Sequence, residues 1–167
     1  MTKLRYAVSI VSLLALAATS VWAEGAGGAP PAEGTPEALA IATLTKAFTA
    51  FGKSDVPTLE QCLAPRLMGI ALDPDTGAPT QIIMQRDDIC KALQQGGAAA
   101  ANNPLAAFKI VEPTAQAGPG DLVLVTYKMS TGDANAKPLG PFWAMVGKTQ
   151  GQWRIFSFTV PMPAPEE

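Results

Sequence analysis

The sequence contains no histidine, only two cysteines and few charged residues, which make up 16% of its 167 positions. Without histidine the chain cannot form a Ser-His-Asp triad, a Cys-His pair or a zinc site with histidine ligands. Catalysis would therefore depend on carboxylates, lysine, tyrosine, cysteine or backbone amides. The Asp-rich segment 73–77 lacks the length and the distal glutamate of a calcium loop, so we interpret it as a turn. We expect no metal site and no cofactor.

Basic residues are sparse and scattered along the chain. Twelve Lys and Arg residues stand against fourteen Asp and Glu residues, which gives a formal net charge of −2. Binding to nucleic acid or to an anionic membrane surface requires a basic face that collects phosphates. We therefore expect neither kind of partner.

The N-terminus has the pattern of a secretory signal. Lys3 and Arg5 precede a nearly unbroken apolar stretch, Tyr6–Ala18, and small residues lead to Ala23. A membrane-spanning helix needs about 20 apolar residues, more than this stretch offers. We predict a signal peptide over residues 1–23 that is cleaved after Ala23, with an uncleaved anchor as the alternative. The mature protein would be periplasmic or secreted, without stable membrane insertion.

Cys62 and Cys90 are the two cysteines. An even number of cysteines in an exported chain favours a disulfide. The loop that it closes, of about 28 residues, would stabilise the fold by roughly 3–4 kcal/mol in the chain-entropy model. The alternative is two reduced cysteines on apolar helix faces in the core.

Composition separates one domain from two irregular ends. Residues 24–34 are mostly Gly, Ala and Pro and predict a flexible leader. Residues 161–167 are rich in proline, which has no backbone N–H to donate to a sheet ladder. We therefore predict that they form a tail outside the folded domain. The folded domain is expected over residues 35–160, a size that suits one core.

The periodicity predicts helices followed by strands. Thr35 and Pro36 are typical of a helix start, and apolar residues recur at helical spacing as far as Gly52. A second, short helix begins after Asp55, and a third begins at Asp87 or Asp88. Strands are expected over 67–72, 80–85, 108–112, 122–130, 142–146 and 152–160. This order indicates an α+β domain with a mostly antiparallel sheet.

Several short motifs add a family resemblance. The motifs are Ala47–Gly52 followed by Lys53–Asp55, then Asp87–Ile89, Asp121–Val125 and Gly151–Ile155. The order of elements and these motifs resemble the nuclear-transport-factor-2-like (NTF2-like) superfamily, which includes SnoaL-like and ketosteroid-isomerase-like proteins. The resemblance covers residues 35–160 and implies a cone-shaped, curved sheet wrapped around the long first helix, with an apolar pocket.

Catalytic members of that superfamily carry a carboxylate or a histidine in the pocket. Here Glu112 interrupts an apolar strand and is the best carboxylate candidate, with the Tyr127 hydroxyl as a possible second group. The alternative for Glu112 is a strand-end residue that faces water. A ligand pocket would be lined by four aromatic residues, which could equally be plain core residues: Phe48, Tyr127, Trp143 and Trp153.

Alternation along the strands predicts two apolar faces. In the strand 122–130, Val125 and Tyr127 share one face and Leu124 shares the other with Thr126. In the last strand a strict period of two puts Ser157 on the same face as Ile155. A sheet with one wet face should alternate more cleanly. We therefore predict a homodimer that pairs through the sheet, with a monomer as the alternative.

These observations lead to two hypotheses of function. The first is an exported, non-catalytic module that binds a small apolar ligand or a protein partner. The second is a small isomerase, lyase or hydrolase that uses a pocket carboxylate with Tyr127. A buried carboxylate that faces an enclosed pocket would discriminate between the two hypotheses.

Overall fold

A computed structural model of the protein describes residues 31–72, 79–95, 108–131 and 137–161. The predicted signal peptide, most of the leader, the turn at 73–77 and the tail from residue 162 lie outside the described residues. The described elements follow in the predicted order, helices before strands. They are α2 (Pro36–Lys53), α3 (Val56–Cys62), β1 (Leu63–Leu72), β2 (Pro79–Gln85), α4 (Arg86–Gln95), β3 (Lys109–Ala117), β4 (Leu122–Ser130), β5 (Leu139–Thr149) and β6 (Gln152–Pro161).

The long helix α2 begins and ends with the residues that its sequence predicts, within one position. The Thr35 hydroxyl accepts a hydrogen bond from the Ala38 N–H at 3.3 Å, and Pro36 occupies the first turn. At the other end Ser54 adopts the left-handed conformation, and its N–H bonds to the last turn. One stripe of the helix is buried: Ala40, Leu44, Ala47, Phe48, Ala50 and Phe51.

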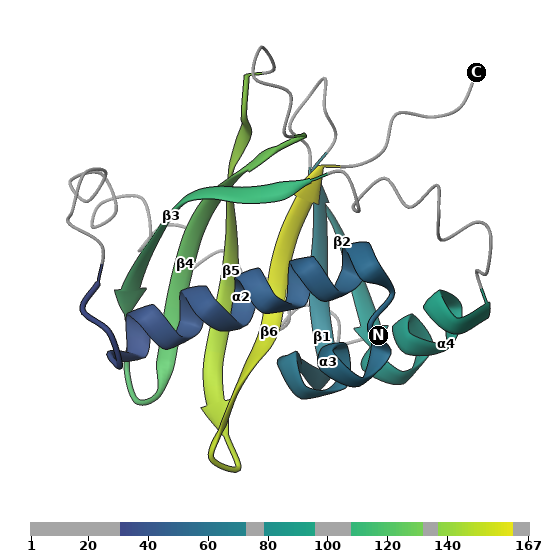
Figure 1. Ribbon diagram of the computed structural model, residues 1–167, viewed down its shortest axis with the longest axis horizontal. Coiled ribbons are helices and arrows are strands. Elements are labelled where there is room, and N and C mark those ends of the chain that lie inside the picture. Colours follow the sequence, from purple (N-terminus) through teal and green to yellow (C-terminus); the bar gives the residue numbers. More distant parts are fainter. Residues whose placement is uncertain (1–30, 73–78, 96–107, 132–136, 162–167) are drawn as a thin grey trace, which may run out of the picture.

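The six strands form one mixed sheet in the order β2-β1-β6-β5-β4-β3. All neighbours are antiparallel except β1 and β6, which run parallel. The α+β class and the mostly antiparallel sheet are thus confirmed. Helix α2 crosses one face of the sheet, and α3 and α4 lie at one end of that face near β1 and β2 (Figure 1).

Bulges bend the sheet and change which side chains face α2. Register shifts interrupt four of the five strand pairs, and an extra residue of this kind increases local bending. In β6, Ile155 pairs with Val146 and Phe158 pairs with Ala144, so both face the helices. Ser157 pairs with Met145 and therefore faces away from α2. A strict period of two placed Ser157 with Ile155, which is wrong because the bulge lies between them.

Two arginines hold the end of α3 against the sheet. The guanidinium groups of Arg86 and Arg154 each donate to the carbonyl oxygen of Glu60 at 3.3 Å. Arg154 also donates to the Leu63 carbonyl at 3.2 Å. Positive groups near the last carbonyls of a helix satisfy unpaired acceptors and interact favourably with the helix dipole. This contact joins α3, α4 and β6.

The two cysteines form no disulfide, so the predicted bridge is wrong. Cys62 ends α3 and Cys90 lies in α4, and both are free, buried thiols. Each thiol packs into the core as a small apolar group, and Cys90 is the one buried residue of α4. Burial raises the pKa of both thiols. The alternative interpretation, reduced core cysteines on apolar helix faces, describes the structure.

We therefore expect slow alkylation of both thiols in the native protein. Because burial limits access and lowers the thiolate fraction, iodoacetamide at pH 8 should react roughly tenfold or more slowly than in denaturant. Mass spectrometry of the protein without reductant should show two modifiable thiols after unfolding. Rapid labelling of the folded protein, or a mass lower by two hydrogens, would contradict the buried, reduced state.

Candidate functional site

Tyr127 is a structural residue on β4, the neighbour of the edge strand β3. Its side chain is buried, and its hydroxyl donates to the carbonyl oxygen of Thr159 at 2.7 Å. The pairing of β5 with β6 ends at Ala144 and Phe158. The Thr159 carbonyl, which accepts the hydrogen bond of Tyr127, lies just beyond this ladder. Burial raises the pKa of Tyr127 well above its ordinary value, which keeps the phenol protonated.

Aromatic rings fill the space between α2 and the sheet. The ring of Phe48 meets the ring of Tyr127 edge-on with centroids 5.7 Å apart, and it meets Phe158 at 6.4 Å. Tyr127 in turn packs against Phe142 at 6.0 Å. Such contacts are typical of a packed core. Phe48 and Tyr127, both predicted to line a pocket, therefore touch each other directly.

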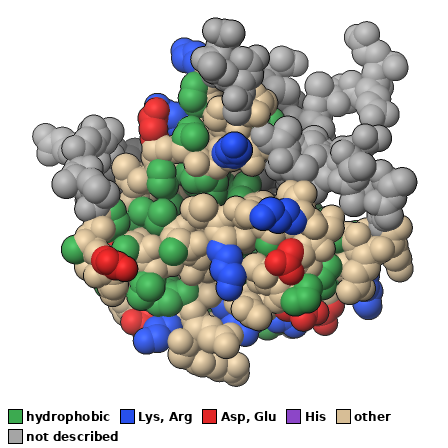
Figure 2. All heavy atoms as spheres, viewed as in Figure 1, with side chains coloured by type: hydrophobic (Ala, Val, Ile, Leu, Met, Phe, Trp, Pro, Cys, Tyr) green, Lys and Arg blue, Asp and Glu red, His purple; other side chains and the backbone are tan. Residues whose placement is uncertain are grey.

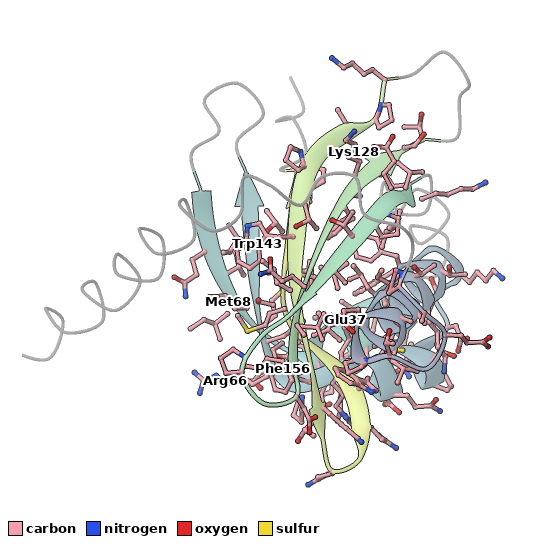
Figure 3. The ribbon with its side chains drawn as sticks, turned by 90° about the vertical axis from the view of Figure 1, so that its left-hand side faces the viewer. Glu37, Arg66, Met68, Lys128, Trp143 and Phe156 are labelled. Atoms are coloured by element: carbon pink, nitrogen blue, oxygen red, sulfur yellow. The ribbon has the colours of Figure 1, made fainter. Side chains whose placement is uncertain are left out.

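The two tryptophans of the predicted pocket lie elsewhere. Trp143 pairs with Thr126 and is half-buried on the side of the sheet away from α2 (Figure 3). Trp153 is half-buried near the turn between β5 and β6 and packs against the edge of the core. The structure brings together Phe48 and Tyr127 but separates both from Trp143.

Glu112, the predicted carboxylate, faces water. It lies where the pairing of β3 with β4 shifts, and its φ of 50° belongs to the left-handed region. Its side chain is 63% exposed and forms an ion pair with the Lys128 ammonium group. Among the residues that the structure describes, the buried polar side chains are Ser157 and Thr159, so none of the described carboxylates is enclosed. The alternative interpretation of Glu112 fits this position.

The groove on the solvent side of α2 has a volume of about 590 Å³. It lies between α2 and α3, outside the space that α2 shares with the sheet. The acidic residue of the groove is Asp55, which accepts hydrogen bonds from the Thr58 N–H and hydroxyl at the start of α3. These bonds lower the pKa of Asp55. The lining residues are Ala42, Thr45, Lys46, Thr49, Ala50, Lys53, Asp55 and Thr58.

The face of the sheet away from α2, here called the outer face, is largely apolar. Met68, Ser157 and Met145 form one row across β1, β6 and β5. Arg66 and Lys128 lie toward opposite ends of this side of the molecule (Figure 3). The large apolar residues of the outer face include Met68, Ile70, Ile83, Leu122, Leu124, Trp143, Met145 and Phe156.

Gly147 makes part of the outer face continuous. A Cβ atom at this position would lie 2.8 Å from Cδ2 of Leu122 and 3.1 Å from Cε2 of Phe156. Without a side chain at 147, the residues from β4 and β6 pack over β5 and approach each other. Sequence reasoning noted an apolar second face, but the role of this glycine depends on strand pairing that the sequence does not reveal.

The helix side of the molecule has a mixed surface. Figure 2 shows Lys, Arg, Asp and Glu side chains interspersed among apolar and uncharged groups on this face. In the described ranges, groups of three or more Cys, Asp or Glu side chains suited to a metal ion are not found. None of the described helices is both long and apolar enough to cross a membrane.

Comparison with solved structures confirms the fold. The chain is similar to a Pectobacterium atrosepticum protein of unknown function, with a TM-score of 0.52 and 12% identity over 79% of this chain and 94% of that one. It is also similar to an NTF2-like protein of unknown function from Shewanella oneidensis, with a TM-score of 0.50 and 14% identity over 73% and 95% of the two chains. No protein-family model and no curated protein matches the sequence. The chain thus has the NTF2-like fold.

We expect Tyr127→Phe to lower the free energy of unfolding by about 1–2 kcal/mol, because the buried Thr159 carbonyl loses its donor. As the control, Glu112→Gln should change the free energy of unfolding by less than about 0.5 kcal/mol, since it removes an exposed ion pair. Urea unfolding measures both values. An effect of Tyr127→Phe no larger than that of Glu112→Gln would contradict the structural role of the hydroxyl.

Proposed function

We propose that this NTF2-like domain is an exported, non-catalytic interaction module that pairs with a second copy through the outer face of its sheet. The observation that carries the proposal is the apolar outer face, which lies opposite the packed core. Sheets with one face in water usually carry polar residues there. Large exposed apolar patches in turn mark surfaces that meet another protein.

The chemistry of the outer face supports a protein contact. Its large side chains are aromatic or methionine at the centre, namely Trp143, Phe156, Met68 and Met145. Aromatic residues and methionine are enriched in the centres of interfaces, where charged residues are depleted. Lys128 carries a charge at one end of this face, and it is paired with Glu112.

The size of the outer face also suits a dimer. Its apolar residues come from the five neighbouring strands β2, β1, β6, β5 and β4. At about 4.8 Å per strand and roughly six residues of 3.3 Å along each, the face measures roughly 24 by 20 Å in projection. The accessible area is larger than this projected area, because the side chains protrude from the sheet. A stable interface buries about 800 Å² on each partner, which is the same order.

A second copy is the partner that we favour. Two apolar sheets stack face to face about 10 Å apart, with their side chains interdigitated. Two copies bring faces of the same length, width and polarity, and most homo-oligomers form in this way around a two-fold axis.

The interior supports a non-catalytic role over the isomerase, lyase or hydrolase hypothesis. Glu112 faces water beside Lys128, and the Tyr127 hydroxyl is bound to the Thr159 carbonyl. Phe48 packs against Tyr127 and Phe158, so aromatic rings occupy the space beside the Tyr127 side chain. We therefore place the interaction on the outer face, while a small apolar ligand stays a prediction from the sequence.

Two leucines of equal exposure test the outer face. Leu122 lies on the outer face and Leu39 on α2, and each is 40% exposed. In equilibrium sedimentation the parent protein should be at least a dimer. Leu122→Glu should weaken the dimer by about tenfold or more, because it buries a charge at the interface. Leu39→Glu should leave the dimer unchanged.

Two results would overturn the pairing through the outer face. The first is a parent protein with the mass of one chain at every concentration. The second is a Leu122→Glu variant that is folded by circular dichroism and as dimeric as the Leu39→Glu variant.

The export proposal has its own test. Expression of the full chain in a bacterial host should yield a periplasmic or secreted product whose intact mass begins at Glu24, because the signal peptidase cuts after Ala23. A chain that keeps Met1 and sediments with membranes would indicate the uncleaved anchor. A full-length chain in the cytoplasm would remove the proposal of export.

A further inference from the structure

We propose that the edge of β2 with which no described strand pairs is a second contact surface, on which β2 pairs antiparallel with β2 of another copy. This goes beyond the proposed function, because it uses the backbone at the edge of the sheet and not the side chains of the outer face. The two edge strands of the sheet, β2 and β3, differ in how well they are protected against pairing.

The β3 edge is protected against pairing. Its ladder with β4 shifts between Val111 and Thr114, and Glu112 there has a φ of 50°. Pro113 follows in the bulge, and the exposed Lys109 begins the strand. Bulges, proline and charged side chains are the devices that keep edge strands from joining other strands.

The β2 edge has none of these devices in its centre. Its seven residues pair with β1 in unbroken register, from Arg66 opposite Gln85 to Leu72 opposite Pro79. The strand contains no charged residue, and proline occurs only at its first position. Ile82 and Ile83 are 47% and 59% exposed, one toward each face. A straight, neutral edge with exposed β-branched residues readily accepts an added strand.

The sequence of β2 favours a second copy as that added strand. Antiparallel pairing centred on Ile83 places this residue opposite its own counterpart and Ile82 opposite Met84 of the other copy. It also places Gln81 opposite Gln85, whose side-chain amides can both donate and accept hydrogen bonds. Residues directly opposite each other share a face, so apolar side chains meet apolar ones and amides meet amides. No like charges meet in this pairing.

Together with the outer face, the β2 edge would give each chain two separate two-fold contacts. Two such contacts assemble four copies or an extended array, whereas one contact gives only a dimer. The edge contact does not depend on the outer-face contact. Each can therefore be removed without the other.

Charge pairs at positions 81 and 85 test the register of the edge contact. The double variant Gln81→Glu with Gln85→Glu puts like charges opposite each other at both ends of the paired segment. The double variant Gln81→Lys with Gln85→Glu puts opposite charges there. Both variants carry the same glutamate beside Arg66, the partner of position 85 in β1, so they differ only at position 81. Both parent residues are exposed.

The measurement is equilibrium sedimentation in a background that carries Leu122→Glu, which removes the outer-face contact. The background protein should still dimerise at high concentration through β2. The like-charge variant should bind itself about tenfold more weakly, and the opposite-charge variant should bind itself at least as tightly as the background. The difference between the two variants should shrink in high salt.

Two results would overturn the edge contact. One is a folded Leu122→Glu background that is monomeric at every concentration, and the other is equal association of the two double variants. A different pattern would separate the two proposals. If Leu122→Glu leaves the mass of the parent unchanged while the charge pairs change it, the outer-face proposal fails and the edge contact stands.

Discussion

The contact between Phe48 and Tyr127 is the constraint on which the rest of the structure depends. It joins α2 to β4, with ring centroids 5.7 Å apart, and Phe51 and Phe158 extend it on both sides. The Tyr127 hydroxyl then bonds to the Thr159 carbonyl and ties β4 to β6 across β5. Because the rings fill this space, α2 lies fixed across one face of the sheet, and the rings that contact Tyr127 are those of Phe48 and Phe142.

The core occupies the α2 side of the sheet, which leaves the outer face as the second large apolar surface. The core takes the apolar residues of β4 that face α2, such as Val123 and Val125, and leaves Leu124 on the opposite side. The described helices all pack on the α2 side, so none of the helices in the described ranges covers the outer face. Apolar area of this extent is favourable to bury, at roughly 25 cal/mol per Å². Contact with another protein is the arrangement that would gain this free energy.

Local signals in the sequence predicted the elements well and their pairing less well. Thr35 and Pro36 mark the start of α2, and the alternation of β4 is visible residue by residue. The parallel pairing of β1 with β6 joins segments far apart in the chain, and no local pattern encodes it. Ser157 was harder to place, since a bulge in β6 changes which residues face the helices. The even number of cysteines suggested a disulfide, but both thiols are reduced and buried in the core. The number of cysteines in the sequence does not reveal which of them pack as apolar core residues.

The bulge at Glu112 determines both where this carboxylate points and whether the β3 edge can pair with another strand. A regular strand would continue the alternation of Ile110 toward the core, and a carboxylate at 112 would then face α2. The left-handed conformation of Glu112 instead turns its side chain toward Lys128 and water. The same bulge, with Pro113 beside it, breaks the line of backbone groups that another strand would need. The interior thus loses its carboxylate and the β3 edge loses its capacity to pair, which leaves β2 as the edge open to a partner.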